Sequence, residues 1–460
     1  MDLSRQTPPN STATSAEDTL RPLLEEHERA GLRRVRSVLT TPQGVEVKID
    51  GRRYLSFCSN NYLGLANDPR VVAAFQRGAG RYGVGSGAAS VVAGHYRAHH
   101  ALEEELAAFT GRERALIFST GYMANLGIVS ALAGRGDAVF EDRLNHASLL
   151  DAATLSRAHL KRYAHTDPAA LWAALAAGNG AKRRLVVTDG VFSMDGDVAP
   201  LPALAAIGRE YGAWLVVDDA HGLGVLGKNG GGSLEHFGLG SDAVPILMGT
   251  LGKALGVFGA FVAGDHAVVE YLMQKARPFI FTTALPPAVA EAARASLAIV
   301  REEPWRREHL MGLVVRFRAG AEGLGLTLGG AATTGREPDR SPSEREPAPR
   351  KGPISNETAV RSPRTPGLYQ SLSKHASTPR KGPISNETAV RSTPIQPVLV
   401  GDSHRAVAIS AALRKKGFFV QAIRPPTVPK GSARLRITFS ATHEPMQVDR
   451  LLDALSDVFS

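Results

Sequence analysis

Apolar runs that end in small or polar residues recur through the middle of the chain. They are "ALIFSTG" (115–121), "DAVFED" (137–142), "RLVVTDGVFSMDGD" (184–197), "WLVVDDAHG" (214–222) and "PILMGTLGKALG" (245–256). Stretches with helical spacing, such as 96–111 and 201–212, lie between them. Continuous apolar strands separated by helices predict βαβ units and a mostly parallel sheet. We therefore expect an α/β domain whose ligands bind beyond the carboxyl ends of the strands.

The pattern changes from about residue 300. A long charged helical run precedes two strand-like runs, "GLGLTL" (323–328) and "TPIQPVLVG" (393–401). Two further segments, 402–423 and 433–459, mix helical and strand patterns. Helices on a small sheet predict a second, α+β domain.

An identical repeat interrupts this second domain. "PRKGPISNETAVRS" occurs at 349–362 and again at 379–392, and residues 335–392 hold nine of the 28 prolines. Because few large apolar residues occur there, burial cannot offset the entropy of ordering the segment. We interpret it as a disordered insertion in an otherwise short loop; the alternative is a docking motif.

The composition and charge of the chain limit which classes of partner and which compartment fit this protein. Residues 335–392 carry eleven basic and six acidic residues, so half of the net charge of +10 lies there and the remainder is mildly basic. No apolar run approaches the roughly 18 residues of a membrane span, and the N-terminus lacks the apolar core of a signal peptide. The single cysteine, Cys58, excludes an internal disulfide and a cysteine metal cluster. We expect a cytoplasmic protein with no nucleic-acid partner, no membrane partner and no metal.

Two residues at predicted strand ends suggest a specific chemistry. Asp218 follows a fully apolar strand, where a carboxylate is costly to bury without a cationic partner. Lys253 ends another strand among glycines, where burial lowers the pKa of an amine and frees its lone pair for an aldehyde. A Schiff-base lysine together with an aspartate for a pyridinium nitrogen is the pairing expected for pyridoxal phosphate. The alternatives are a helix cap for Asp218 and a solvent-reaching side chain for Lys253.

Other polar residues follow the same strands in order. Gly121 and Tyr122 lie at a strand-to-helix turn that can expose backbone N–H groups to a phosphate. His146 precedes a helix, where its imidazole could stack on a flat ring or serve only as a structural hydrogen bonder. Ser193 lies beyond another strand end. The glycine-rich stretch at 82–90 follows a helical pattern, whereas a dinucleotide-binding fingerprint must follow a strand, so we reject that function for it. We interpret His99 and His100, on a charged helical run, as exposed to solvent.

Several motifs together resemble those of the α-oxoamine synthases, pyridoxal phosphate enzymes of fold type I. They are "SNNYLGL", "GSGAAS", "STGYMAN", "LNHASLLDA", "VFSMDGD", "DDAHGLGVLG", "GTLGKALG" and "IRPPTVPKGSARLRI". The resemblance covers about residues 20–330 and 393–458. It implies a large, mostly parallel sheet domain and a smaller α+β C-terminal domain. The implied boundaries are a disordered tail at 1–20, an N-terminal arm at 21–60, a large cofactor-binding domain at 61–300 and a small domain at 301–460 with the insertion at about 332–392.

The resemblance also implies roles for individual residues. Lys253 would form the imine with the cofactor and later move protons, Asp218 would pair with the pyridinium nitrogen, and His146 would stack on the ring. The residues expected to contact the cofactor are Gly121, Tyr122, His146, Ser193, Asp218, His221, Thr250 and Lys253.

A second set of residues is expected at the substrates. By the resemblance, Asn60 and Arg424 hold the amino acid carboxylate, which an arginine fork binds through two hydrogen bonds. Arg33 would contact the acyl substrate, Thr427 would make a further substrate contact, and His146 is expected at the substrate as well as at the cofactor. Thr282 or Thr283 would approach the phosphate of a neighbouring subunit in a homodimer.

The implied reaction is an acyl transfer with loss of carbon dioxide. "STGYMANLG", "DGDVAPL" and "RPPTVP" are most similar to family members that condense L-alanine with a pimeloyl thioester in biotin synthesis. Glycine C-acetyltransferase, 5-aminolevulinate synthase and serine palmitoyltransferase share the lysine and aspartate, so they remain alternatives. The sequence leaves open whether coenzyme A or an acyl carrier protein bears the acyl group.

Overall fold

The structure is a computed structural model that describes residues 15–178, 180–329 and 393–460. The predicted insertion at about 332–392 and the first fourteen residues of the predicted tail lie outside the described residues. The rest of the predicted tail is helical, because α1 spans Ala16–Arg29. Ser15 starts this helix by accepting the N–H of Asp18 at 3.0 Å, while the Asp18 carboxylate accepts the N–H of Ser15 at 3.2 Å. The tail prediction was wrong from Ser15 onward because this reciprocal cap was not recognised.

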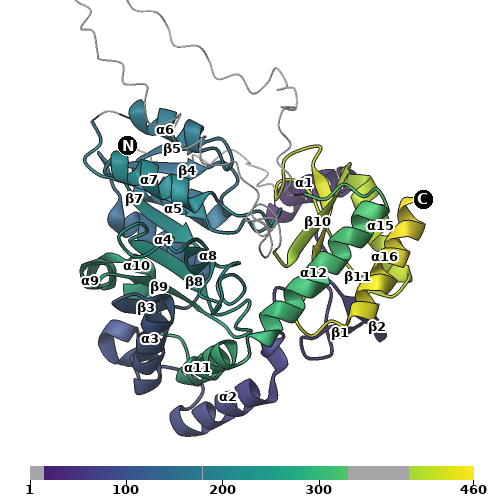
Figure 1. Cartoon of the computed structure of the whole chain (residues 1–460), viewed down its shortest axis with the longest axis horizontal. Coiled ribbons are helices and arrows are strands. Elements are labelled where there is room, and N and C mark those ends of the chain that lie inside the picture. Colours follow the sequence, from purple (N-terminus) through teal and green to yellow (C-terminus); the bar gives the residue numbers. More distant parts are fainter. Residues whose placement is uncertain (1–14, 179, 330–392) are drawn as a thin grey trace, which may run out of the picture. The chain divides into compact units, whose positions relative to one another are not determined.

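A seven-stranded sheet organises the larger domain, in the order β3-β9-β8-β7-β6-β4-β5 (Figure 1). Its strands are β3 (Arg114–Phe118), β4 (Ala138–Asp142), β5 (His159–Tyr163), β6 (Arg184–Asp189), β7 (Trp214–Asp218), β8 (Ile246–Thr250) and β9 (Ala260–Gly264). Each of the five apolar runs predicted in this domain forms a strand. Strand β9 runs in the direction opposite to the other six strands of this sheet, so the predicted mostly parallel sheet is confirmed with one reversed strand.

Helices cover both faces of this sheet, because alternate residues of each strand point to opposite sides. Val187, Val216 and Met248 pack under one group of helices, whereas Val186 and Val217 pack under the other. The first group comprises α4 (Gly121–Leu132), α5 (Ala147–Ser156), α9 (His266–Lys275) and α10 (Arg277–Ile280). The opposite face packs on α6 (Pro168–Ala176), α7 (Leu201–Glu210), α8 (Ser233–Phe237), α3 (Arg97–Thr110) and α11 (Pro287–Glu302).

The glycine-rich stretch at 82–90 follows helix α2 (Pro69–Tyr82), which confirms that it lacks the strand a dinucleotide fingerprint requires. Two short helical turns, η1 (Leu65–Asn67) and η2 (Ser90–Gly94), lie before α2 and at the end of the glycine-rich stretch.

His99 is buried, and its Nε2 lies 2.6 Å from the carbonyl oxygen of Leu285, so the interpretation of His99 as solvated was wrong.

Two small sheets form the second domain. β10 (Ile395–Gly401), β13 (Ala433–Thr438) and β12 (Gln421–Ile423) pair antiparallel, whereas β1 (Glu46–Ile49), β2 (Arg52–Ser56) and β11 (Phe418–Phe419) form the other sheet. Helices α12 (Trp305–Gly323), α15 (Ser403–Lys415) and α16 (Pro445–Phe459) complete it. The predicted strand at 323–328 was wrong, because α12 continues to Gly323 and Leu328 makes only an isolated bridge to Val398.

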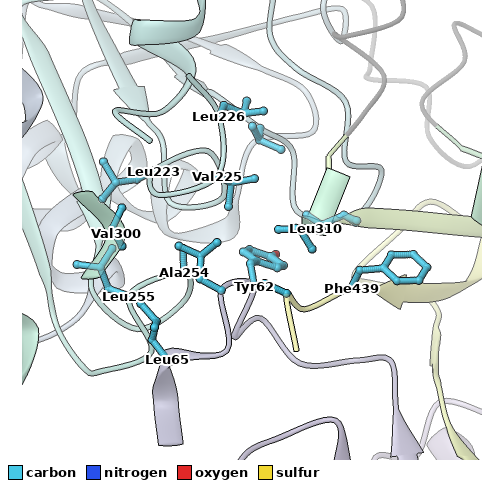
Figure 2. Close-up of a cluster of buried hydrophobic side chains, with 14 of the residues drawn as sticks. Tyr62, Leu65, Leu223, Val225, Leu226, Ala254, Leu255, Val300, Leu310 and Phe439 are labelled. Carbon is cyan, nitrogen blue, oxygen red and sulfur yellow. The ribbon is translucent and has the colours of Figure 1, made fainter. Parts of the chain in front are cut away.

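One apolar core joins the loops beyond β7 and β8 to α12 and β13. Figure 2 shows Tyr62 among Ala254, Leu310 and Phe439, side chains that come from distant parts of the sequence. This packing fixes the turn that carries Lys253, since Ala254 is fully enclosed. Among the described residues, no helix is long and apolar enough to cross a membrane.

We expect Leu310→Ala to destabilise the protein by about 2–5 kcal/mol, because it removes a fully buried side chain and leaves a cavity. Val315→Ala on the same helix is the matched control, since Val315 is 58% exposed. Denaturant unfolding of the purified variants measures both effects. Equal, small losses for the two variants would show that this core does not hold the domains together.

Candidate active site

The carboxyl ends of β6, β7 and β8 and the starts of α4 and α5 enclose a cavity of about 220 Å³. The sequence-predicted cofactor contacts all line it: Gly121, Tyr122, His146, Ser193, Asp218, His221, Thr250 and Lys253. Parallel strands bring their carboxyl ends to one edge of the sheet, so residues far apart in sequence meet there. Asn125, Ser148 and Asp189, which were not predicted, line the same cavity.

Lys253 lies in the turn after β8, and its Nζ is 3.0 Å from His221 Nε2. Burial lowers the pKa of Lys253 to about 8, although the nearby carboxyl groups of Asp218 and Asp189 oppose this shift. The neutral amine is therefore far more populated near neutral pH than in an ordinary lysine. This agrees with the expectation that burial prepares Lys253 as a nucleophile.

Asp218 ends β7 and is 5% exposed. Asn125 of α4 donates from Nδ2 to Asp218 Oδ2 at 2.7 Å, and the N–H of Ala220 donates to Oδ1 at 3.0 Å. The same Asn125 Nδ2 donates to Ser148 Oγ at 2.8 Å, which anchors the amide to α5. Both carboxylate oxygens are thus hydrogen-bonded and held in place, as a buried carboxylate requires.

Asp189 ends β6 directly beside Asp218, since the two residues are partners in the β6–β7 register. Its carboxyl group accepts the N–H of His146 at 3.2 Å. Burial first, and the charge of Asp218 second, raise the pKa of Asp189 well above its ordinary value. Burial and the neighbouring carboxyl group therefore both favour the protonated form of Asp189.

His146 caps α5, and its Nδ1 lies 2.7 Å from Ser148 Oγ. Burial lowers the pKa of His146, and the charge of Lys253 lowers it further, while Asp218 acts in the opposite direction. The imidazole is therefore neutral at neutral pH. A neutral ring at the cavity wall, anchored through one nitrogen, can stack against a flat ligand.

The start of α4 supplies an anion site. Thr120 caps the helix by accepting the N–H of Met123 at 3.2 Å. The N–H groups of Gly121 and Tyr122 belong to the first turn, which has no acceptors within the helix. At the neighbouring strand end, Thr250 Oγ1 donates to the carbonyl oxygen of Gly259 at 3.0 Å, so that side chain is fixed. Such a helix start, reinforced by the helix dipole, can bind phosphate.

A hydrogen-bonded chain leads away from Lys253. His221 Nδ1 lies 2.7 Å from the hydroxyl oxygen of Tyr62, and Tyr62 donates to Asn60 Oδ1 at 3.2 Å. Burial lowers the pKa of His221 well below its ordinary value. A neutral His221 with its proton on Nδ1 donates to the hydroxyl oxygen of Tyr62 and accepts from Lys253 at Nε2. Each hydrogen bond from Lys253 to Asn60 then has one donor and one acceptor.

Arg436 completes this chain, and the sequence analysis missed it. Its two terminal nitrogens donate to Asn60 Oδ1 at 3.2 Å, and its Nε donates to the carbonyl oxygen of Ser193 at 2.6 Å. Arg436 is 7% exposed, and its charge contributes to the lowered pKa of Lys253. The guanidinium is thus within electrostatic range of the amine and joins the small domain to the strand-end cavity.

The predicted substrate residues divide between two cavities. Asn60 reaches the Lys253 cavity through Tyr62, whereas Arg33, Arg424 and Thr427 line a second cavity of about 510 Å³. Arg424 donates to the backbone carbonyl oxygens of Gly31 and Arg33. The structure therefore does not bring Arg424 to Asn60.

Thr282 lines a small cavity together with Ser119, two residues before Gly121, whereas Thr283 does not line it. A contact between either threonine and a neighbouring subunit stays a prediction.

Comparisons with known proteins agree with this geometry. The family model "Aminotransferase class I and II" matches residues 52–334 and 370–455. An 8-amino-7-oxononanoate synthase of Methylococcus capsulatus is 55% identical over 92% of this chain and 94% of that protein. A serine palmitoyltransferase of S. paucimobilis, solved with a bound PLP–myriocin aldimine, is 28% identical with a TM-score of 0.79, over 96% of this chain and 97% of that one.

A solved 8-amino-7-oxononanoate synthase from Francisella tularensis is 28% identical with a TM-score of 0.65, over 88% of this chain and 97% of that one. The expected fold, a large mostly parallel sheet domain with a smaller C-terminal domain, is confirmed by these neighbours and by the sheets described above. The chain therefore belongs to the aminotransferase class I and II family, in the α-oxoamine synthase group that its motifs predicted.

Proposed function

We propose that this chain is a pyridoxal phosphate-dependent 8-amino-7-oxononanoate synthase, which condenses L-alanine with a pimeloyl thioester in biotin synthesis. The observation that carries the proposal is the meeting of Lys253 and Asp218 in one cavity, an amine with a pKa of about 8 beside a hydrogen-bonded buried carboxylate. The name of the relative at 55% identity supports this choice of reaction.

The residues of the cavity fit the cofactor. When bound, pyridoxal phosphate supplies a ring that withdraws electrons from the Cα of an amino acid. Lys253 would hold it as an imine, Asp218 would pair with the ring nitrogen, and His146 would lie on the ring face. The N–H groups at the start of α4, together with Thr250, would bind the phosphate.

Lys253 is also the group placed to move the Cα proton. With the cofactor and L-alanine bound, the free Nζ would accept the proton from Cα and later return one to the product. A pKa of about 8 suits both directions near neutral pH. His221 Nε2, 3.0 Å away, accepts a hydrogen bond from Nζ and orients it.

The lowered pKa predicts the pH dependence of cofactor attachment. The rate at which apoenzyme takes up pyridoxal phosphate should rise with pH and level off above about pH 8, because only the neutral amine attacks. The growth of the visible absorption band measures this rate. Nα-acetyl-lysine, whose amine titrates near 10.4, is the control for the cofactor's own titration; the same pH profile for both would contradict a lowered pKa.

We propose that Arg436 and Asn60 bind the carboxylate of L-alanine. Arg436 donates to the carbonyl oxygen of Ser193, which lines the Lys253 cavity, so Asn60 and Ser193 already orient its fork of donors. A carboxylate between this guanidinium and the amide of Asn60 would lie within reach of Lys253. The expectation that Arg424 has this role stays a prediction, and its place in the second cavity favours a role with the thioester.

Exchanging each arginine for lysine separates these roles. Arg436→Lys should raise the KM for L-alanine by roughly tenfold or more, since it loses a two-bond contact with a carboxylate. Arg424→Lys should leave that KM unchanged and raise the KM for the thioester. Steady-state kinetics with each substrate varied in turn measures both. If Arg424→Lys raised the KM for L-alanine and Arg436→Lys did not, the two assignments would be reversed.

The overall reaction balances when one proton is taken up from water. The Cα–H bond of L-alanine breaks first, and Lys253 is placed to take that proton. A bond forms between the alanine Cα and the acyl carbon, and the acyl C–S bond breaks. The thiolate leaves and takes up a proton, and the alanine carboxyl group leaves as carbon dioxide. The Cα then receives a proton, for which Lys253 is placed.

A different amino acid or acyl group is the alternative, because the chain also resembles serine palmitoyltransferase at 28% identity. The purified protein should be given alanine, glycine or serine, each with pimeloyl-, acetyl-, succinyl- or palmitoyl-coenzyme A. Mass spectrometry of the products should show condensation of alanine with the pimeloyl donor. A faster reaction with another pair would overturn the assignment.

We further propose that the enzyme acts as a cytoplasmic homodimer with shared active sites. The exposed side chain of Phe281, next to Thr282, leaves this segment open to contact with a second subunit.

A further inference from the structure

The second cavity, of about 510 Å³, is rich in arginine. Five arginines line it, namely Arg33, Arg34, Arg36, Arg414 and Arg424. Arginines come from three different parts of the chain, the segment 32–37, helix α15 and the turn after β12, whereas no acidic residue lines the cavity.

These arginines are only partly neutralised. Arg33 binds Glu28 at 2.9 Å and Arg414 approaches Asp50 at 3.8 Å, both on the exposed rim. Within the described parts of the chain, no carboxylate lies at salt-bridge distance from Arg34, Arg36 or Arg424.

Arg424 instead donates to two backbone carbonyl oxygens, those of Gly31 and Arg33. Burial and the nearby charge of Arg34 lower its pKa, which shows that positive charge is crowded there. Crowded guanidinium groups without carboxylates favour binding of an anion.

The rest of the lining is suited to an organic chain. Leu32, Val35 and Phe419 supply apolar surface beside the arginines. The cavity is also close to the Lys253 site, because its residue Gln421 lies opposite Arg436 in the β12–β13 register. A ligand with an anionic end and an extended body could therefore reach from this cavity toward the reacting atoms.

We propose that this cavity binds the phosphopantetheine arm of the acyl donor, with its phosphate held by Arg34 and Arg36. This inference rests on the proposed function, in which the donor is a thioester. Coenzyme A and acyl carrier proteins both attach the acyl group through phosphopantetheine, so the phosphate is common to the two sources. The planar, forked guanidinium groups match phosphate oxygens better than lysine would.

The test compares donors with and without the phosphate. Pimeloyl-pantetheine, pimeloyl-phosphopantetheine, pimeloyl-coenzyme A and a pimeloyl carrier protein are assayed with holoenzyme carrying Arg34→Gln and Arg36→Gln. The KM for the three phosphate-bearing donors should rise about tenfold or more, whereas the KM for pimeloyl-pantetheine and for L-alanine should stay unchanged. Arg52→Ala, an exposed arginine of β2 outside the cavity, is the control.

Other outcomes overturn the inference. A loss confined to the carrier protein would place these arginines at a protein surface contact, and a loss confined to coenzyme A would place them at its other phosphates. A similar rise for pimeloyl-pantetheine, or no change at all, would exclude phosphate binding.

Direct binding separates this inference from the proposed function. Calorimetric titration of phosphopantetheine into holoenzyme should show binding that weakens about tenfold in the double variant. If wild-type protein turned over no donor but still bound phosphopantetheine through these arginines, the proposed function would fail and the site would stand. If it turned over the donors but bound phosphopantetheine equally well in the variant, the site would fail.

Discussion

Replacing Lys253 by alanine should reduce the turnover of alanine and pimeloyl thioester by at least about 10³- to 10⁴-fold. The variant loses both the amine that would hold the cofactor and the base that would take the Cα proton. Lys253 lines the cavity with its Nζ at His221, and we find no second lysine among the residues that line it. Product formation under saturating substrates measures the loss.

Two comparisons make this result specific. Lys275→Ala, at the exposed end of α9, should leave turnover unchanged. The Lys253→Ala protein should still bind pyridoxal phosphate without a covalent bond, because Asp218, His146 and the start of α4 are intact. Near-normal turnover by Lys253→Ala would remove the proposed mechanism.

Asp218→Asn should lower turnover by about 10²- to 10³-fold, since breaking a buried charge pair costs about 3–5 kcal/mol. Asparagine keeps the shape of the side chain and one acceptor for Asn125, but it cannot carry the charge that would keep the ring nitrogen protonated. Steady-state turnover and cofactor affinity of the variant measure both consequences.

Asp189→Asn is the matched control for this substitution. Asp189 lies next to Asp218 in the sheet, and its pKa is raised well above the ordinary value, which favours its neutral form. A neutral amide in its place can still accept the N–H of His146, so turnover should fall far less than in Asp218→Asn. A larger loss for Asp189→Asn would show that the charge resides on Asp189, and equal losses would show that the function does not depend on Asp218 alone.

The strand-end residues could be predicted from sequence because their signal is local. Asp218 and Lys253 each follow a continuous apolar run, and the physics of a parallel sheet places the ends of such runs at one edge. The meeting of these residues with His146 and the turn at Gly121 therefore needed only the order of strands and helices. The helix start at α4 was predictable for the same reason, since small residues directly follow a strand.

Other parts of the site had no local signal. Asn125 lies within an apolar helical run, so its bond to Asp218, 93 residues away, appears only once α4 packs on the sheet. Arg436 is one of two arginines in a short strand, and nothing in the pattern shows which of them reaches Asn60, 376 residues away.

The raised pKa of Asp189 could not be predicted from the sequence for a different reason. It ends an apolar run as Asp218 does, but the rise in its pKa comes first from burial and second from the register of β6 and β7, which places the two carboxyl groups side by side. Strand β9 was not among the predicted runs, and the sequence could not have given its direction, because an apolar strand has the same pattern in either orientation.

Borohydride reduction of the holoenzyme, followed by peptide mass spectrometry, tests the imine at Lys253 most directly. Reduction converts an imine into a stable secondary amine, so the modified residue can be located. The predicted result is a pyridoxyl phosphate adduct on the peptide that contains Lys253, absent from Lys253→Ala. An adduct on a different lysine, or no adduct in protein saturated with the cofactor, would contradict the proposed chemistry.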